Sequence, residues 1–133
     1  MTGGAVESAS GFTLDAGALI AHERFDVRLE ALVRRARERH LTVTVPATAL
    51  AQAVRSPERQ ARLARLVRQS VTDVVPMDRS DAYAVGRLLA AAGTSDVVDA
   101  HFVLCARRAG QPIVTSDPDD LRRLDPEAVL VAL

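Results

Sequence analysis

The stretch GFTLDAGALIA, residues 11–21, decides the fold class of this chain. Its first four residues, Gly11–Leu14, form a short apolar run that predicts a buried β-strand. Small and aliphatic residues from Ala16 to Ala21 predict a turn or two of helix, and Asp15 stands at the junction. A strand that leads directly into a helix is the first half of a βα unit, and such units build parallel sheets.

The rest of the chain repeats this alternation of strands with helices. Further strands are predicted from β-branched and aliphatic runs at Leu41–Val45, Val71–Val75, Pro112–Thr115 and Val129–Val131. Apolar periodicity and capping residues predict the following helices: Phe25–Arg39, a helix from Ala47, Pro57–Gln69 after Ser56, a helix from Asp78 or Ser80 through Ala91 to Gly93, a helix from Thr94 or Ser95 to Gly110, and Pro118–Leu124. We therefore expect a three-layer α/β domain, with a parallel five-strand sheet covered by helices on both faces.

Composition and charge suit a single globular domain. Of the 133 residues, 48% are hydrophobic and 26% are charged, which is enough to form a core. We expect one domain over residues 11–133, and a disordered leader over residues 1–10, which are mostly small and polar. The formal net charge is zero, so binding to nucleic acid would require local basic patches.

The cysteine content and the hydropathy of the chain indicate where in the cell the protein acts and which kinds of metal site it can contain. The single cysteine, Cys105, rules out an internal disulfide and a cysteine-rich zinc site. The chain shows no signal-peptide pattern and no apolar run of the roughly 20 residues that a membrane span needs. We expect a cytoplasmic protein that has no membrane segment.

Two aspartates directly follow predicted strands, Asp15 after the first and Asp117 after the fourth. Ligands of open α/β sheets lie at the carboxyl ends of the strands, so the two carboxylates converge if these strands are neighbours. Asp96 and Asp99 are three residues apart and share one face of the first turn of a predicted helix. Asp120 repeats this spacing after Asp117. These five aspartates are the candidate site residues.

A cluster of carboxylates predicts a hard divalent cation. Carboxylates that are packed together raise one another's pKa unless a cation compensates their charge. Oxygen ligands without histidine or cysteine suit Mg²⁺ or Mn²⁺ better than zinc. Such a cation activates water and stabilises the charge on an attacked phosphodiester. The alternative for Asp96, Asp119 and Asp120 is an ordinary helix-capping role, because acidic residues are favoured in the first turn of any helix.

Four stretches that span nearly the whole chain, FTLDAGALIA, VPATALAQAVR, GTSDVVDAHFVLCARRAG and PIVTSDPDDLRRL, resemble PIN domains of the VapC type, the ribonuclease toxins of type II toxin–antitoxin pairs. The resemblance implies that the first and fourth strands are central neighbours in the sheet. It implies catalytic and metal-binding roles for Asp15, Asp99 and Asp117, a further metal-site role for Asp96, and supporting roles for Thr115 and Asp120. It also implies Mg²⁺ or Mn²⁺ as cofactor, RNA as substrate, an antitoxin protein as partner, and a homodimer.

One position departs from the family pattern. Gln52 stands where the family usually carries a glutamate, in the helix after the second strand. Its amide oxygen can coordinate Mg²⁺ or hold a water molecule, but the site then has one negative charge fewer and should bind a cation more weakly. Two functions therefore remain open: a metal-dependent endoribonuclease, and a catalytically weak module of the same fold that binds RNA or a protein.

Arginines recur every three or four residues at Arg55, Arg59, Arg62, Arg65 and Arg68. They could form a basic stripe that contacts RNA phosphates or acidic residues of an antitoxin. The alternative is the ordinary solvated face of an amphipathic helix.

Overall fold

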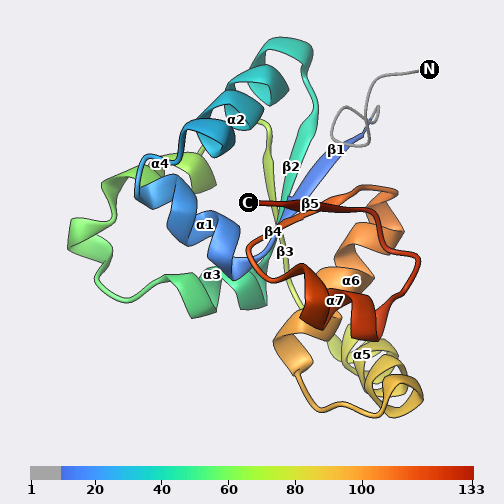
Figure 1. Cartoon of the computed structure of the whole chain (residues 1–133). Helices are drawn as coiled ribbons and strands as arrows, with labels where there is room; N and C mark the ends of the chain where they lie inside the picture. Colours follow the sequence, from blue (N-terminus) through green and yellow to red (C-terminus); the bar gives the residue numbers. More distant parts are fainter. Residues whose placement is uncertain (1–9) are drawn as a thin grey trace.

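A parallel sheet forms the centre of the computed structural model, which describes residues 10–133 (Figure 1). The predicted leader lies outside the described residues except for Ser10. The strands are β1 (Gly11–Leu14), β2 (Thr42–Pro46), β3 (Thr72–Val75), β4 (Ile113–Thr115) and β5 (Leu130–Ala132). Their order is β3-β2-β1-β4-β5, and every neighbouring pair is parallel. The predicted parallel five-strand sheet, with the first and fourth strands as central neighbours, is confirmed.

Helices cover both faces of this sheet (Figure 1). The helices in chain order are α1 (Ala16–Glu23), α2 (Val27–Arg39), α3 (Ala47–Ala53), the 3₁₀ helix η2 (Pro57–Arg59), α4 (Ala61–Val67), α5 (Arg79–Ala92), α6 (Val97–Ala109) and α7 (Pro118–Leu124). Helices α1, α2 and α4 lie together on one side, and α5, α6 and α7 lie together on the other. Since β1 is covered on both faces, all four of its residues are buried.

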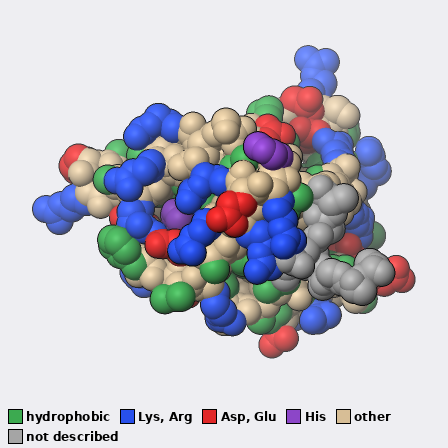
Figure 2. All heavy atoms as spheres, turned by 90° about the horizontal axis from the view of Figure 1, so that it is seen from above, with side chains coloured by type: hydrophobic (Ala, Val, Ile, Leu, Met, Phe, Trp, Pro, Cys, Tyr) green, Lys and Arg blue, Asp and Glu red, His purple; other side chains and the backbone are tan. Residues whose placement is uncertain are grey.

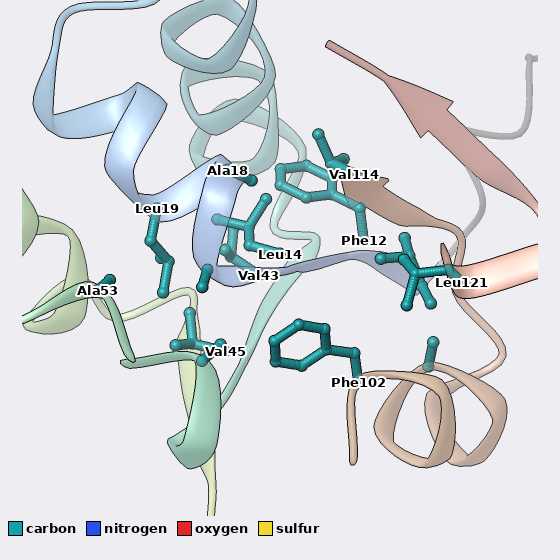
Figure 3. Packing of buried hydrophobic residues seen from close by; sticks show 14 of the residues in the cluster. Phe12, Leu14, Ala18, Leu19, Val43, Val45, Ala53, Phe102, Val114 and Leu121 are labelled. Atoms are coloured by element: carbon teal, nitrogen blue, oxygen red, sulfur yellow. The ribbon is translucent and has the colours of Figure 1, made fainter. Parts of the chain in front are cut away.

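The core lies around the two central strands (Figure 3). Phe12 and Leu14 of β1 are 1% and 0% exposed, and Phe102 of α6 and Leu19 of α1 pack in the same cluster. Interiors of this kind are close-packed and deform little. The carboxyl end of β1, which is the base of the site described below, is therefore held rigidly.

The second helix begins later than the sequence predicts. Asp26 is its N-cap and accepts hydrogen bonds from the backbone amides of Arg28 and Leu29, so α2 begins at Val27. The helix predicted from Phe25 therefore starts two residues too early, and Phe25 lies outside α2. It has a positive φ of 64° and is 65% exposed, and its ring lies 4.0 Å from the guanidinium of Arg62.

The single helix predicted over Pro57–Gln69 is divided into η2 and α4. The division falls at Gln60, whose side chain accepts hydrogen bonds from the amides of Arg55 and Ser56 and donates one to Ala53. These bonds hold the backbone of Gln60 outside the helical region, at φ −112° and ψ 54°. The spacing of hydrophobic residues does not predict such hydrogen bonds between a side chain and the backbone, so it does not predict this break in the helix.

Three of the predicted helix caps in the second half of the chain are confirmed. Asp78 caps α5 in a capping box with Asp81, and Gly93 ends that helix in the left-handed conformation, as predicted. Gly110 ends α6 in the same way. The N-cap of α6, however, is Asp96 and neither Thr94 nor Ser95.

No single helix within residues 10–133 has the length and apolar composition needed to cross a membrane. Helices α5 and α6 pass that test only as a pair, with a bend of 109° between them.

Candidate functional site

A cavity of about 440 Å³ opens beside the carboxyl ends of β1 and β4. All five candidate aspartates line it, from the end of β1, the start of α6 and the start of α7, together with Gln52 of α3. The lining residues are Asp15, Ala16, Gly17, Ile20, Gln52, Arg55, Asp96, Asp99, Phe102, Ser116, Asp117 and Asp120. The predicted convergence of the two strand-end aspartates on one place in the fold is therefore found.

Asp15 is the most firmly held of these carboxylates. Its backbone amide donates to Val114 of β4 at 3.2 Å, and its Oδ1 caps α1 by accepting from the amide of Ala18 at 2.7 Å. The side chain is buried, and burial raises the pKa of Asp15. Hydrogen bonds from Thr115, Ala18 and the backbone of Ser116 act in the opposite direction on that pKa, because they stabilise the charged form.

Asp99 and Asp96 face the cavity from the start of α6. Asp96 caps the helix, and its Oδ1 accepts from the backbone amide of Asp99 at 2.9 Å. Burial raises the pKa of Asp99 to about 7, and the nearby charges of Asp96, Asp120 and Asp15 add to the shift. Asp99 is therefore a carboxyl group whose negative charge the surrounding protein does not compensate.

Asp117 and Asp120 enter the cavity from the start of α7. A hydrogen bond with the side chain of Asp120 raises the pKa of Asp117, with burial as the second cause. Asp120 also lies 3.4 Å from the guanidinium of Arg123. The backbone amide of Asp117 donates to Oγ1 of Thr115 at 2.8 Å. Thr115 does not line the cavity, and it is fully buried behind Asp15 and Asp117.

The sequence interpretation missed the contributions of Arg55 and Gly17 to this cavity. Arg55 was assigned to the basic stripe, but its side chain lines the cavity and donates to the carbonyls of Ala51 and Val54. Gly17 permits a close approach: a Cβ there would lie 1.9 Å from Oγ of Ser116. The available signal was a glycine in the first turn of a helix, where it lowers helix propensity.

The predicted basic stripe does not form one surface. Its arginines are distributed over the loop after α3, η2, and α4 with its C-cap Arg68, because the helix is broken at Gln60. Arg55 lines the aspartate cavity, whereas Arg62 and Arg65 line a different cavity between α1, α2 and α4.

The donor set around the aspartate cavity suits a hard divalent cation. Carboxylates and one amide supply oxygen ligands, and neither histidine nor cysteine lines the cavity. Burial raises the pKa of Asp15 and Asp99, and the hydrogen bond with Asp120 raises the pKa of Asp117, so the surrounding protein disfavours the charged forms of these carboxyl groups. Within residues 10–133, however, no group of three or more His, Cys, Asp or Glu side chains is placed to hold a metal ion. The aspartates share a cavity without forming a closed set of ligands.

Comparison with known proteins identifies the family. The family model for the PIN domain matches residues 12–126. No curated protein matches the chain. Eight chains of solved structures do match, and one of them belongs to VapBC2 from Rickettsia felis bound to a DNA fragment from their promoter. That match has a TM-score of 0.64 and 13% sequence identity, and it covers 91% of this chain and 97% of the other.

The structural match concerns the fold, and the family model covers most of the chain, including the strand-end aspartates Asp15 and Asp117. This chain belongs to the PIN domain family.

Proposed function

We propose that this protein is a metal-dependent endoribonuclease of the VapC type, the toxin of a type II toxin–antitoxin pair. The observation that carries the proposal is the gathering of five aspartates around one cavity of about 440 Å³, at the sheet edge where α/β folds bind ligands. Membership of the PIN domain family supports it. The uncompensated charge on Asp99 supports the need for a cation.

Asp15, Asp99 and Asp117 would hold Mg²⁺ or Mn²⁺, with Asp96 as a further ligand. A bound divalent cation supplies Lewis acidity and lowers the pKa of a water molecule, which is the chemistry that hydrolysis of a phosphodiester requires. Small movements of the side chains around the cavity would have to bring these ligands together, since no three of them are yet placed to hold an ion.

The surrounding residues hold the carboxylates in position. Thr115 hydrogen-bonds to Asp15 and accepts from the amide of Asp117, so one hydroxyl orients the residues at both strand ends. Asp120 hydrogen-bonds to Asp117, which fits the supporting role expected for it. Arg55 is the one cationic side chain on the cavity wall, and it would contact a phosphate group of the RNA.

Gln52 lines the cavity from α3, the position at which the family usually carries a glutamate. We infer that its amide oxygen serves as a neutral ligand or holds a water molecule. The cavity then has one negative charge fewer than the family pattern implies. This feature favours the second candidate function, a catalytically weak module of the same fold that binds RNA or protein.

RNA cleavage by the purified protein distinguishes the two functions. We expect cleavage of single-stranded RNA with Mg²⁺ or Mn²⁺, complete loss of it with EDTA, and loss of it in Asp15→Asn. Asp119→Asn is the matched control, because Asp119 is an exposed aspartate of α7 that does not line the cavity. Well-folded protein that binds RNA without cleaving it would support the weak module instead.

The proposed function also includes binding to an antitoxin protein and formation of a homodimer. The solved VapBC2 structure contains both proteins of its pair on promoter DNA. We propose that this chain pairs with an antitoxin that masks its activity, forms a homodimer and acts in the cytoplasm. Co-purification with the product of an adjacent reading frame tests the pairing with an antitoxin. Sedimentation of the free chain tests the homodimer.

A further inference from the structure

A second cavity, of about 340 Å³, lies between α1, α2 and α4 and shares no residue with the aspartate cavity. Basic and polar side chains dominate its wall: His22, Glu30, Arg34, Arg37, Arg62 and Arg65. Its volume is within the range of roughly 300–1,000 Å³ that small-ligand pockets occupy. We call it the arginine pocket.

The arginine pocket carries positive charge that the protein does not neutralise. Within residues 10–133, Glu30 is the only acidic residue on its wall, and Oε2 of Glu30 lies 2.8 Å from Nη2 of Arg62. Among the described residues, Arg34, Arg37 and Arg65 form no salt bridge. Figure 2 shows many arginine side chains, with fewer acidic ones among them, on one face of a molecule whose formal net charge is zero. The pocket is thus a local basic patch of the kind that anion binding requires.

His22 adds a buried polar atom that has no partner. Its side chain is 8% exposed and lines the pocket, and its Nδ1 is the one buried side-chain nitrogen or oxygen in residues 10–133 without a hydrogen bond. A buried polar atom left unsatisfied costs about 1–3 kcal/mol. The adjacent backbone is fixed, because the carbonyl of His22 accepts from Nε of Arg62 at 3.1 Å. Because this Nδ1 has almost no accessible surface, a rotation of the imidazole ring would be needed before it could donate to an anion oxygen in the pocket.

We propose that the arginine pocket binds a phosphate group. Arg34, Arg37 and Arg65, which form no salt bridge among the described residues, and one ring nitrogen of His22 offer donors from several directions. A phosphate group presents two or three non-bridging acceptor oxygens, and it carries one negative charge in a backbone diester and up to two in a monoester. A single carboxylate can be paired by one arginine, as Glu30 is paired by Nη2 of Arg62 through one hydrogen bond. The donor set therefore favours phosphate over the acidic side chains of a protein. This proposal does not depend on catalysis at the aspartate cavity.

Two sources could supply the phosphate: the backbone of an RNA strand, and a free small phosphate compound. Helix α1 lies between the two cavities, with Asp15 at its start and His22 near its end, roughly 10 Å apart along the helix axis. An RNA strand that reaches the aspartate cavity could therefore also reach the pocket.

The test is a titration of the full chain followed by NMR of the histidine ring nitrogens, with EDTA present so that RNA is not cleaved. The probes are inorganic phosphate, adenosine monophosphate, a short single-stranded RNA and an acidic peptide. The spectrum of His22→Gln assigns the His22 signals among those of the other histidines. We expect phosphate to shift the His22 signals.

The double variant Arg37→Gln/Arg65→Gln should weaken phosphate binding by at least about tenfold, through the loss of two charge-assisted hydrogen bonds. Arg79→Gln/Arg87→Gln is the matched control, because it removes two exposed arginines of α5 that do not line the pocket. Tighter binding of RNA than of adenosine monophosphate identifies the strand as the source, and equal binding per phosphate identifies the small compound. The proposal is overturned by unchanged His22 signals, by equal losses in both double variants, or by binding of the acidic peptide alone.

Discussion

The hydroxyl of Thr115 accepts a hydrogen bond from the backbone amide of Asp117 at 2.8 Å. The same side chain hydrogen-bonds to Asp15, so a fully buried threonine joins the residues that end β1 and β4. The geometry of the aspartate cavity thus depends on a residue that does not line it.

Replacing Thr115 with valine keeps the shape of the side chain and removes the hydroxyl. The amide of Asp117 and the buried carboxyl of Asp15 each lose a partner, so we expect the free energy of unfolding to fall by about 1–3 kcal/mol. Urea denaturation measures this change, and cation affinity should fall with it. Thr94→Val, at an exposed threonine, is the control and should leave both quantities unchanged. Equal effects of the two variants would contradict the role given to Thr115.

The charge on Asp99 should destabilise the protein when no cation is bound. Its pKa in the folded protein is about 7, above the ordinary value of 3.8, so the folded state binds the proton more tightly than the unfolded state. The stability that this proton contributes is fully present below pH 3.8 and is lost as the pH rises through about 7.

In EDTA at pH 8 or so, Asp99→Asn should therefore raise the free energy of unfolding by about 1 kcal/mol, a small value because Asp99 is only partly buried and water screens its charge. Added Mg²⁺ should stabilise the parent protein and leave Asp99→Asn unaffected. Thermal unfolding over a series of pH values tests this, and a variant less stable than its parent in EDTA would contradict it.

Gly17 is required by its contact with the loop after β4. A Cβ at Gly17 would lie 1.9 Å from Oγ and 2.9 Å from Cβ of Ser116, so Gly17→Ala should cost about 1–3 kcal/mol of stability. Ser116→Gly removes both contacting atoms and should recover most of the loss in the double variant. Gly86→Ala, in α5 with open space around it, should instead stabilise by about 0.5–1 kcal/mol. Chemical denaturation of Gly17→Ala, Ser116→Gly, their double variant and Gly86→Ala measures these changes in the free energy of unfolding.

Gln52→Glu should raise cation affinity by about three- to tenfold, because it adds a negative charge to the wall of the aspartate cavity. Ala51→Glu places the same charge at an exposed neighbouring position that does not line the cavity, and it should have little effect. Calorimetric titration with Mg²⁺ measures both. Unchanged affinity in Gln52→Glu would exclude Gln52 from the cation's surroundings.

The strands of the sheet and the acidic residues of the aspartate cavity could be predicted from patterns that are local in the sequence. Asp15 and Asp117 each follow a short apolar strand, and parallel strands bring their carboxyl ends to the same edge. The position of Asp99 follows from helical spacing after Asp96. These features depend on local periodicity and on one topological rule, whereas the expectation that β1 and β4 are neighbours came from the resemblance to PIN domains.

What sequence alone does not predict depends on contacts between distant residues. The break at Gln60 comes from side-chain bonds to the loop after α3, and the exposure of Phe25 comes from the capping of α2 by Asp26. The arginine pocket needs α1, α2 and α4 to be packed together. Periodicity placed Arg62 and Arg65 on the predicted stripe, and it did not bring them together with Arg34 and Arg37 of α2.

Binding of Mn²⁺ to the intact, metal-stripped protein, followed by electron paramagnetic resonance, tests the central claim most directly. The account predicts saturable binding that is lost in Asp15→Asn and kept in Asp119→Asn, because Asp15 lines the aspartate cavity and Asp119 does not. Absence of saturable binding in the folded parent protein, or equal binding by both variants, would contradict the assignment of the aspartate cavity as a divalent-cation site.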